Sequence, residues 1–355
     1  MSASRRRIPV AVLGATGAVG QAFVRLLAGH PWFELAEVAA SERSVGKRYH
    51  EATHWLEGAM PPEAAPLVVE SCHPASVKSA LVFSALDAAV AGDVEAAFAR
   101  AGRVVLSNAR NFRMAADVPL LIPEVNPDHL ALLEAQRRER GWTGAIITNP
   151  NCAATVVAMA LAPLHRAFGV RQCFVTTLQA ISGAGYPGVA SLDILGNVIP
   201  FIGGGEEEKI ETETPKMLGD LVGLTVKPAA IAMSAQVTRV PVEHGHTVCL
   251  AIALERRATP EQAMEALEHW AGEIVDLSLP SAPTPPIVVT RDDARPQPRR
   301  DVNHGRGMTV TVGRVRRDPI LDLRLVALGH NIQRGAAGAS ILNAELAVAR
   351  GIVTL

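Results

Sequence analysis

The sequence has few cysteines, and their spacing excludes two kinds of site. Only four cysteines occur in 355 residues: Cys72, Cys152, Cys173 and Cys249. None stands in the close pairs that mark a zinc site or a redox motif. We therefore expect reduced thiols, of which most are small buried apolar residues. Cys152 differs from the other three cysteines in its surroundings.

Net charge and long apolar runs are also lacking. Lysine and arginine total 34 against 35 acidic residues, so no polyanionic partner is indicated. The one basic cluster, Arg5 to Arg7, lies in a short polar tail that is more typical of a solvated end than of a nucleic-acid site. No apolar run approaches the roughly 20 residues that span a bilayer, and the N-terminus lacks a signal-peptide apolar region. We expect a cytoplasmic protein with neither nucleic acid nor membrane as partner.

The length of the chain and its first 150 residues indicate the fold class. A chain of 355 residues, 48% hydrophobic, is too long for one ordinary core, so about two domains are expected. The first part alternates helix-like stretches with short β-branched runs at 10–14, 34–40, 80–86, 104–107 and 145–148. This alternation predicts a parallel sheet with crossover helices.

The pattern changes after residue 152 and predicts a second, α+β domain. A long helix candidate is followed by strand candidates at 173–182 and 247–255 and a helix candidate at 260–275. Runs at 308–315 and 321–328 suggest further sheet, and 336–351 a terminal helix. The prolines of "LPSAPTPP" (279–286) and "RPQPRR" (295–300) predict loops, because proline lacks the backbone donor.

Glycines after the first predicted strand favour a nucleotide site. Gly14, Gly17 and Gly20 form GxxGxxG, and the missing side chains let the backbone approach a pyrophosphate at a helix N-terminus. A tight βα turn without a ligand is the alternative. After the second strand comes "SERS", in which Ser41, Arg43 and Ser44 are suited to a 2′-phosphate. This favours NADP, although Glu42 keeps NAD possible and a plain polar loop is the alternative.

Cys152 stands between two apolar runs, directly after the turn residues "NPN" and before a helix-like stretch. The unpaired N–H groups of a helix N-terminus favour a thiolate and lower the pKa of the thiol. The corner therefore suits a nucleophile. Pro163 predicts a bend or break further along the helix.

A thiolate that attacks an acyl carbon needs a proton partner and an oxyanion donor. The segment "RVPVEHGHT" brings Arg239, His244 and His246 together. The two histidines would share a strand face, but no third ligand is evident, so no metal site is expected. A surface or core histidine is the alternative, and sequence distance alone does not establish that Cys152 meets either one.

Seven ordered motifs resemble aspartate-semialdehyde dehydrogenase, in particular its archaeal and fungal-type branch: "GATGAVG", "FRM…DVPLLIPEVN", "NPNC", "QAISGAG", "EEEK", "RVPVEHGH" and "GAAGASILNAE". The resemblance spans nearly the whole chain. It implies an α/β protein of glyceraldehyde-3-phosphate-dehydrogenase-like architecture, with a Rossmann NADP-binding domain at 1–151 and 332–355 and an α+β catalytic and dimerisation domain at 152–331. It also implies a homodimer or homotetramer.

The reaction implied by the resemblance is the reversible NADPH-dependent reduction of β-aspartyl phosphate to aspartate semialdehyde with release of phosphate, on the route to lysine, threonine and methionine. Cys152 matches the nucleophile that forms a thioester, Gln179 the residue that orients it, and His246 the acid/base. Arg239 matches the binder of the substrate α-carboxylate, for which a guanidinium offers a planar fork. Glu206 matches the contact to the α-amino group, and Lys209 and Arg113 match phosphate binders.

The resemblance also assigns cofactor contacts. The pyrophosphate turn would be Gly14, Thr16, Gly17 and Val19, the 2′-phosphate pocket Ser41, Arg43 and Ser44, and the nicotinamide side Gly185 and Gln333. "EEEK" alone would instead be a solvated helix face with an ion pair, and Arg110 has no clear assignment.

Three alternative functions remain open from the sequence. Malonyl-CoA reductase resembles this branch and keeps the cysteine, but its substrate has no amino group for Glu206 to contact. N-acetyl-glutamyl-phosphate reductase shares the architecture more remotely. An inactive cofactor-binding regulator is the third, against which the retention of cysteine, glutamine, arginine and histidine in all four chemical motifs argues.

Overall fold

The computed structural model describes residues 7–353 and contains two compact units. We call them the parallel-sheet unit, which comprises the chain up to Leu121, Asp128–Asn149 and the chain from Ser340, and the mixed-sheet unit, which comprises Ile122–Pro127 and Pro150–Ala339. Arg5 and Arg6 lie outside the described residues, while Arg7 lies 3.6 Å from Glu34 in an ion pair. No described helix combines the length and the apolar character that a membrane crossing requires.

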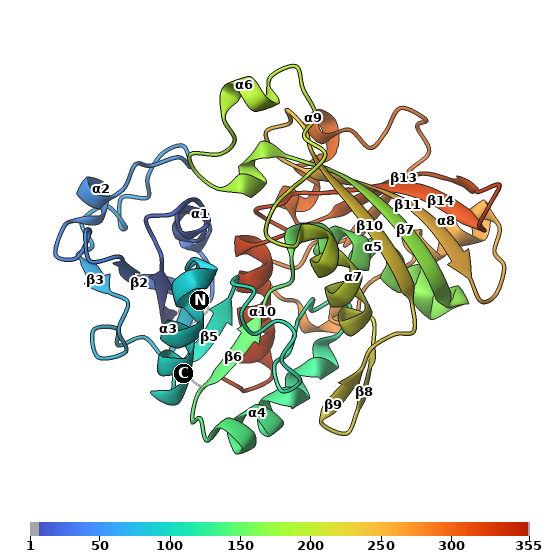
Figure 1. The fold of residues 1–355 in the computed structure, drawn as a ribbon. Helices are drawn as coiled ribbons and strands as arrows, with labels where there is room; N and C mark the ends of the chain where they lie inside the picture. The colour runs from blue at the N-terminus through green and yellow to red at the C-terminus, as the bar shows by residue number, and fades with distance from the viewer. Residues whose placement is uncertain (1–6, 354–355) are drawn as a thin grey trace, which may run out of the picture. The chain divides into compact units, whose positions relative to one another are not determined.

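The parallel-sheet unit is built on six strands in the order β3-β2-β1-β4-β5-β6 (Figure 1). The strands are β1 (Ile8–Leu13), β2 (Phe33–Ala40), β3 (Val69–Ser71), β4 (Leu81–Ser84), β5 (Val104–Ser107) and β6 (Ala145–Thr148). Every neighbouring pair is parallel, as predicted. This order is that of dinucleotide-binding folds, in which ligands bind at the carboxyl ends of the strands.

Helices follow the strands of this sheet. They are α1 (Ala18–Leu27), α2 (Tyr49–Ala52), α3 (Ala88–Arg100) and α4 (Leu132–Arg140), with the 3₁₀ turn η1 (Pro127–Ala131). The apolar face of α1 buries Phe23, which stacks on Phe83 of β4 with ring centroids 4.9 Å apart. This packing holds the start of α1 beside the carboxyl end of β1.

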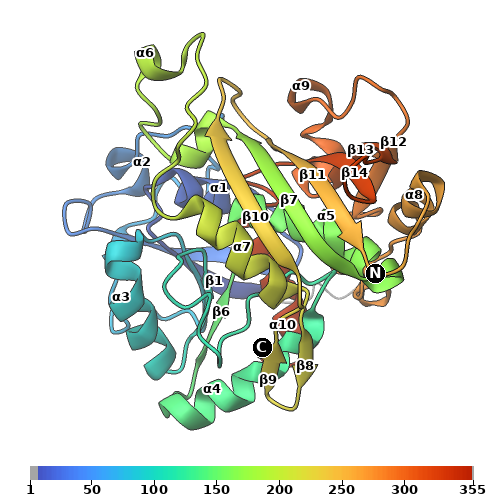
Figure 2. The same ribbon diagram turned by 45° about the vertical axis from the view of Figure 1, so that its right-hand side comes forward.

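The mixed-sheet unit contains a second six-stranded sheet, in the order β10-β7-β11-β14-β13-β12 (Figure 2). Its strands are β7 (Val170–Gln179), β10 (Ala232–Arg239), β11 (His246–Leu254), β12 (Ile287–Thr290), β13 (Val310–Arg317) and β14 (Leu323–Gly329). The two outer pairs are parallel and the inner pairs antiparallel. Together, the two sheets confirm the α/β fold class.

Helix α5 (Cys152–Phe168) packs against this second sheet and against α7 (Glu206–Met217). It buries every side chain from Ala153 to Leu164. Of the bend or break expected at Pro163, a break is wrong, because the helix continues through this residue. A proline removes only one backbone donor, and this helix is held by apolar burial along its length.

Helix α8 (Pro260–Glu268) is shorter than the predicted 260–275, and part of the expected loop at 295–300 is a short helix, α9 (Pro298–Asp301). The terminal helix is α10 (Ala337–Ala349). The remaining elements of the mixed-sheet unit are η2 (Ile181–Ala184), α6 (Ser191–Ile194), β8 (Asp220–Val222), β9 (Thr225–Lys227), η3 (Val275–Leu277) and η4 (His304–Gly307).

Candidate active site

The cysteine corner is a capped helix start. Cys152 is the first residue of α5, and Asn151 is its N-cap. The side-chain Oδ1 of Asn151 accepts hydrogen bonds from the N–H groups of Ala153, at 3.0 Å, and Ala154, at 3.1 Å. The thiol therefore lies where the dipole of a long helix favours negative charge.

His246 is the partner of this cysteine. It begins β11, and its Nε2 lies 3.1 Å from Sγ of Cys152. The other ring nitrogen, Nδ1, accepts the N–H of Ala180 at 3.1 Å. Because a neutral imidazole carries one proton, we assign it to Nε2, which faces the sulfur. Burial, together with the nearby Arg239 and His330, lowers the pKa of His246 to about 3, so the ring stays neutral at physiological pH.

Arg239 lies beside the pair at the end of β10. Its Nη1 donates to the carbonyl of Ala180 at 2.8 Å. Burial lowers the pKa of Arg239, and the charges of Cys152 and Glu206 oppose that shift. A Cβ added to Gly183 would lie 2.9 Å from Arg239 Nη1 and 3.0 Å from His246 Cε1. Only glycine therefore lets both side chains keep these positions.

Glu206 and Lys209 form an ion pair in the first turn of α7. Lys209 Nζ lies 2.6 Å from Glu206 Oε1, and the two side chains are only 19% and 13% exposed. The other carboxylate oxygen accepts from Asn151 Nδ2 at 2.9 Å. The ion pair is thus mostly buried and tied to the cysteine corner, unlike a solvated helix face.

Three further predicted residues, Gln179, Gly185 and Gln333, also belong to the mixed-sheet unit. Gln179 ends β7 opposite Arg239 in register, is buried, and donates to Thr177 Oγ1 at 3.4 Å. Gly185 follows η2 with a positive φ of 71°. Gln333 is buried and its Cγ covers Gly307.

The two histidines of "EHGH" face different partners. His244 Nδ1 lies 3.0 Å from Ser182 Oγ, whereas His246 faces Cys152. In the described part of the chain no group of three histidine, cysteine, aspartate or glutamate side chains converges as a metal site would require.

Sequence reasoning missed several residues that build this corner: Asn151 as the cap that also contacts Glu206, Gly183, and Asn331. Asn331 Oδ1 accepts the N–H of Gly245 at 2.9 Å, and its Nδ2 donates to Ser182 Oγ at 2.8 Å. An asparagine just before an apolar helical run is a helix-start signal that could have identified the cap. No local pattern identifies the other two, because their partners are distant in sequence.

In the parallel-sheet unit, the glycine turn connects β1 to α1. Gly14 has a φ of 71°, and a Cβ there would lie 2.6 Å from the carbonyl oxygen of Ala85. A Cβ on Gly20 would lie 2.2 Å from the oxygen of Gly14. The N-cap of α1 is Gly17, which offers no side-chain cap. Thr16 lies in the glycine turn and Val19 in the first turn of α1. Because no side chain caps α1, its first N–H groups are open to a ligand at the carboxyl edge of the sheet.

Ser41, Arg43 and Ser44 form a turn directly after β2, with the N–H of Ser44 bonded to the oxygen of Ser41 at 2.8 Å. The Arg43 side chain is exposed there.

Arg113, a predicted phosphate binder, and Arg110 follow β5. Arg113 is buried and donates from Nη2 to the Asn108 carbonyl at 2.8 Å. Arg110 is exposed.

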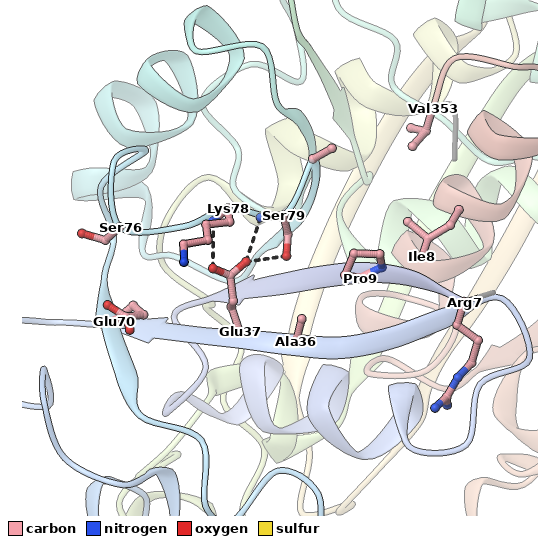
Figure 3. A pocket seen from close by; sticks show the side chains of 11 residues that line it. Arg7, Ile8, Pro9, Ala36, Glu37, Glu70, Ser76, Lys78, Ser79 and Val353 are labelled. Atoms are coloured by element: carbon pink, nitrogen blue, oxygen red, sulfur yellow. Dashed lines mark hydrogen bonds between the residues drawn. The ribbon is translucent and has the colours of Figure 1, made fainter.

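A pocket of about 700 Å³ lies elsewhere in this unit, lined by Ile8 and Pro9 of β1, Glu37 of β2, and Lys78 to Ala80 before β4 (Figure 3). The Glu37 carboxylate accepts hydrogen bonds from the backbone N–H groups of Lys78 and Ser79, both at 2.8 Å. Ile8 and Pro9 begin β1 and Lys78 to Ala80 precede β4, so the pocket lies away from the carboxyl ends of these strands, where the glycine turn is. It is therefore not the nucleotide site.

A dinucleotide-type parallel sheet in one unit and a cysteine–histidine pair in the other define a class, the nicotinamide-dependent dehydrogenases that act through a cysteine. Two family models match the chain. Residues 9–133 match the semialdehyde dehydrogenase NAD-binding domain, and residues 161–334 match the semialdehyde dehydrogenase dimerisation domain.

Relatives match over nearly the full length. An aspartate-semialdehyde dehydrogenase of Archaeoglobus fulgidus is 49% identical over 98% of this chain and 100% of the relative, and one of Schizosaccharomyces pombe is 48% identical over 97% and 99%. The structure of aspartate semialdehyde dehydrogenase with NADP from Candida albicans has a TM-score of 0.90 at 41% identity, covering 98% of this chain and 100% of that one. The chain belongs to the aspartate-semialdehyde dehydrogenase family.

Proposed function

We propose that this chain is an NADP-dependent oxidoreductase that interconverts β-aspartyl phosphate and aspartate semialdehyde through a thioester on Cys152. The observation that carries the proposal is the 3.1 Å approach of Cys152 Sγ to His246 Nε2 at the start of α5. Nearby stand a guanidinium and a carboxylate suited to an amino-acid substrate. The names of the relatives supply the substrate and the cofactor.

The glycine turn fits the proposed cofactor. The close approaches at Gly14 and Gly20 leave no room for side chains, and the uncapped start of α1 offers N–H groups to a pyrophosphate. The residues that would hold NADP are Gly14, Thr16, Gly17 and Val19 at the pyrophosphate, Ser41, Arg43 and Ser44 at the 2′-phosphate, and Gly185 and Gln333 at the nicotinamide. When bound, NADPH supplies the hydride that reduces the acyl group.

The chain's own residues perform the acyl transfer. The Cys152 thiolate, favoured by the helix start and by Arg239, attacks the acyl carbon of β-aspartyl phosphate. A carbon–sulfur bond forms, the carbon–oxygen bond to phosphate breaks, and phosphate leaves. After reduction the carbon–sulfur bond breaks, which returns the thiolate and frees the aldehyde. Gln179 would orient the acyl group.

His246 would act from Nε2. Its Nε2–H lies next to the sulfur, so it can donate to the thiolate and to the oxygen that becomes charged when the acyl carbon is tetrahedral. This geometry supports the donor half of the acid/base role expected from the resemblance. A neutral histidine that donates a hydrogen bond suits a site where oxygen charge develops.

The charged residues near the N-terminus of α5 would recognise the substrate. Arg239 offers two parallel N–H groups to the α-carboxylate. Glu206 would meet the α-amino group, which malonyl-CoA lacks. Lys209 and Arg113 would bind phosphate, and the ion pair of Lys209 with Glu206 holds the lysine in the first turn of α7.

We also propose a homo-oligomer in the cytoplasm. The match to a dimerisation domain supports the first point, and so does an open apolar face on β7, where Phe174 is 56% and Leu178 37% exposed. A homodimer built on this face, alone or as part of a homotetramer, would cover both side chains. The described cysteines are all free thiols, and catalysis needs Cys152 reduced, which fits a reducing compartment.

The test is a steady-state assay with matched substrates. Aspartate semialdehyde, NADP and phosphate should yield NADPH, whereas malonyl-CoA with NADPH should not react. Cys152→Ser should lose turnover but still bind NADPH, since a hydroxyl is a far poorer nucleophile at neutral pH. Faster turnover of malonyl-CoA would replace the proposal with the alternative reductase, and NADPH binding without any turnover would indicate a regulator.

A further inference from the structure

The carbonyl groups of the glycine turn are held by donors from the same unit. The oxygen of Gly14 accepts the N–H of Gly17 at 3.0 Å, and the oxygen of Gly17 accepts the N–H of Gln21 at 2.9 Å. The two carbonyls between them are held by side chains. Tyr49 donates its hydroxyl to the oxygen of Ala15 at 2.7 Å, and Gln21 Nε2 donates to the oxygen of Thr16 at 2.9 Å.

Both donors are buried and held in place. Tyr49 is fully buried at the start of α2, and burial raises the pKa of its phenol, so it remains a donor. Gln21 is also buried; its Nε2 donates to the His54 carbonyl at 3.0 Å and its Oε1 accepts the N–H of Leu56 at 2.7 Å. The segment from Tyr49 to Glu57 is therefore linked to the turn in two ways, directly by the Tyr49 hydroxyl and indirectly by Gln21 of α1, which bonds to both the turn and this segment.

These bonds determine where the N–H groups of the turn point. A peptide unit is planar and trans, so its C=O and the next N–H point in opposite directions. With the Ala15 carbonyl directed at Tyr49, the N–H of Thr16 points away from the buried phenol. The Thr16–Gly17 peptide is held at both ends, by Gln21 and by Gly14.

Building on the proposed role of this turn in binding NADP, we propose that Tyr49 and Gln21 are positioning residues for the cofactor. They hold the carbonyls of Ala15 and Thr16 inward and so fix the path of the turn, which leaves the N–H of Thr16 and the first N–H groups of α1 oriented toward the pyrophosphate before it binds, while the N–H of Gly17 stays bonded to the oxygen of Gly14. An anion site built in advance binds more tightly because less order is lost on binding. Neither side chain needs to touch the cofactor.

The experiment measures binding of two probes by calorimetry to the full-length protein. NADP contains the pyrophosphate, whereas 2′-AMP carries the adenosine and the 2′-phosphate without it. Tyr49→Phe should weaken NADP roughly three- to tenfold, the effect of one neutral hydrogen bond, and leave 2′-AMP unchanged. In turnover, KM for NADP should rise with kcat unchanged. Gln21→Met should behave in the same way, which keeps the test open if Tyr49→Phe folds poorly.

Two control variants separate positioning from other effects. Arg43→Ala should weaken both probes, because it would remove a 2′-phosphate contact. Arg25→Gln breaks the 2.7 Å ion pair of α1 with Glu57 but leaves the turn carbonyls bonded, so NADP affinity should not change. Equal losses in Arg25→Gln and Tyr49→Phe, or wild-type NADP affinity in both Tyr49→Phe and Gln21→Met, would overturn the inference. A wild-type protein that binds neither probe would overturn the proposed function itself.

Discussion

Gly183 has no side chain, yet its position decides whether two proposed site residues fit. We expect Gly183→Ala to lower kcat/KM at least tenfold, because a new methyl group would displace Arg239 or His246 by a few tenths of an ångström or more. Steady-state kinetics measure the loss, and thermal unfolding should show a stable protein. Gly203→Ala is the matched control, since a Cβ there meets nothing within 4 Å and the residue does not have a positive φ. Wild-type kinetics in Gly183→Ala would contradict the described geometry.

The ring of His246 carries a prediction about pH. With Nδ1 bonded to the Ala180 N–H and a pKa of about 3, the folded protein should keep this ring neutral from pH 5 to 8. Nitrogen NMR should show Nδ1 unprotonated and Nε2 protonated across that range, with His246→Asn identifying the signal. The unfolded chain takes up a proton near pH 6.5, so this residue's contribution to stability should fall as pH drops from 6.5 toward 3. A protonated Nδ1 at neutral pH would refute the assignment.

The sequence predicted which residues have side chains suited to catalysis, but it did not predict which of these side chains are in contact. Cys152 and His246 are 94 positions apart, and their contact depends on α5 and β11 packing in one unit. The contacts of Asn331 and Gly183 likewise depend on loops from three parts of the chain. Such contacts follow from tertiary packing, which local pattern does not encode.

Among the elements, the start of α5 is the one most closely tied to function. Asn151→Ala should destabilise the protein by about 1 kcal/mol through loss of the cap, and should also raise KM for the substrate, because Glu206 loses a partner. Asn151→Asp keeps the cap oxygen but places a carboxylate beside the sulfur and Glu206. It should therefore slow alkylation of Cys152 at neutral pH with less loss of stability than the alanine variant. Equal alkylation rates in Asn151→Asp and wild type would contradict this.

Helix α3 carries a buried acid whose effect on stability has the opposite sign to that of His246. Glu95 is fully buried and accepts from Ser107 Oγ at 2.8 Å, and burial raises its pKa from 4.5 to about 7. Between these values the folded state binds more protons than the unfolded state, so stability falls as pH rises. Glu95→Gln should therefore be more stable than wild type at pH 8, on the order of 1–3 kcal/mol, and the gain should vanish near pH 4.5. A gain that is independent of pH would show that ionisation is not the cause.

Elements were predictable where one periodicity dominates. Strands β1, β2, β4, β5 and β6 coincide with the apolar runs, and their parallel pairing was expected. Strand β10 was not predicted because "AMSAQVTR" mixes small and polar residues. It forms a strand because it pairs in parallel with β7. Strand β3 spans only three residues, which is too short for a pattern.

For the whole molecule, the open face of β7 predicts the assembly. In sedimentation experiments Phe174→Asp should reduce a wild-type dimer to monomers, or a wild-type tetramer to dimers, because it places a charge in the proposed interface. Ile320→Asp changes an apolar residue that is 88% exposed in the β13–β14 turn, and should leave the assembly intact. An unchanged assembly in Phe174→Asp would exclude this face.

We propose that Cys152 carries the acyl group between the two half-reactions. The experiment mixes the enzyme with aspartate semialdehyde and NADP in the absence of phosphate. We predict a burst of NADPH close to one equivalent per active site and an acyl adduct on Cys152 in mass spectrometry, with turnover resuming only when phosphate is added. Steady NADPH formation without phosphate, or the same burst in Cys152→Ser, would exclude a thioester on Cys152 as the intermediate.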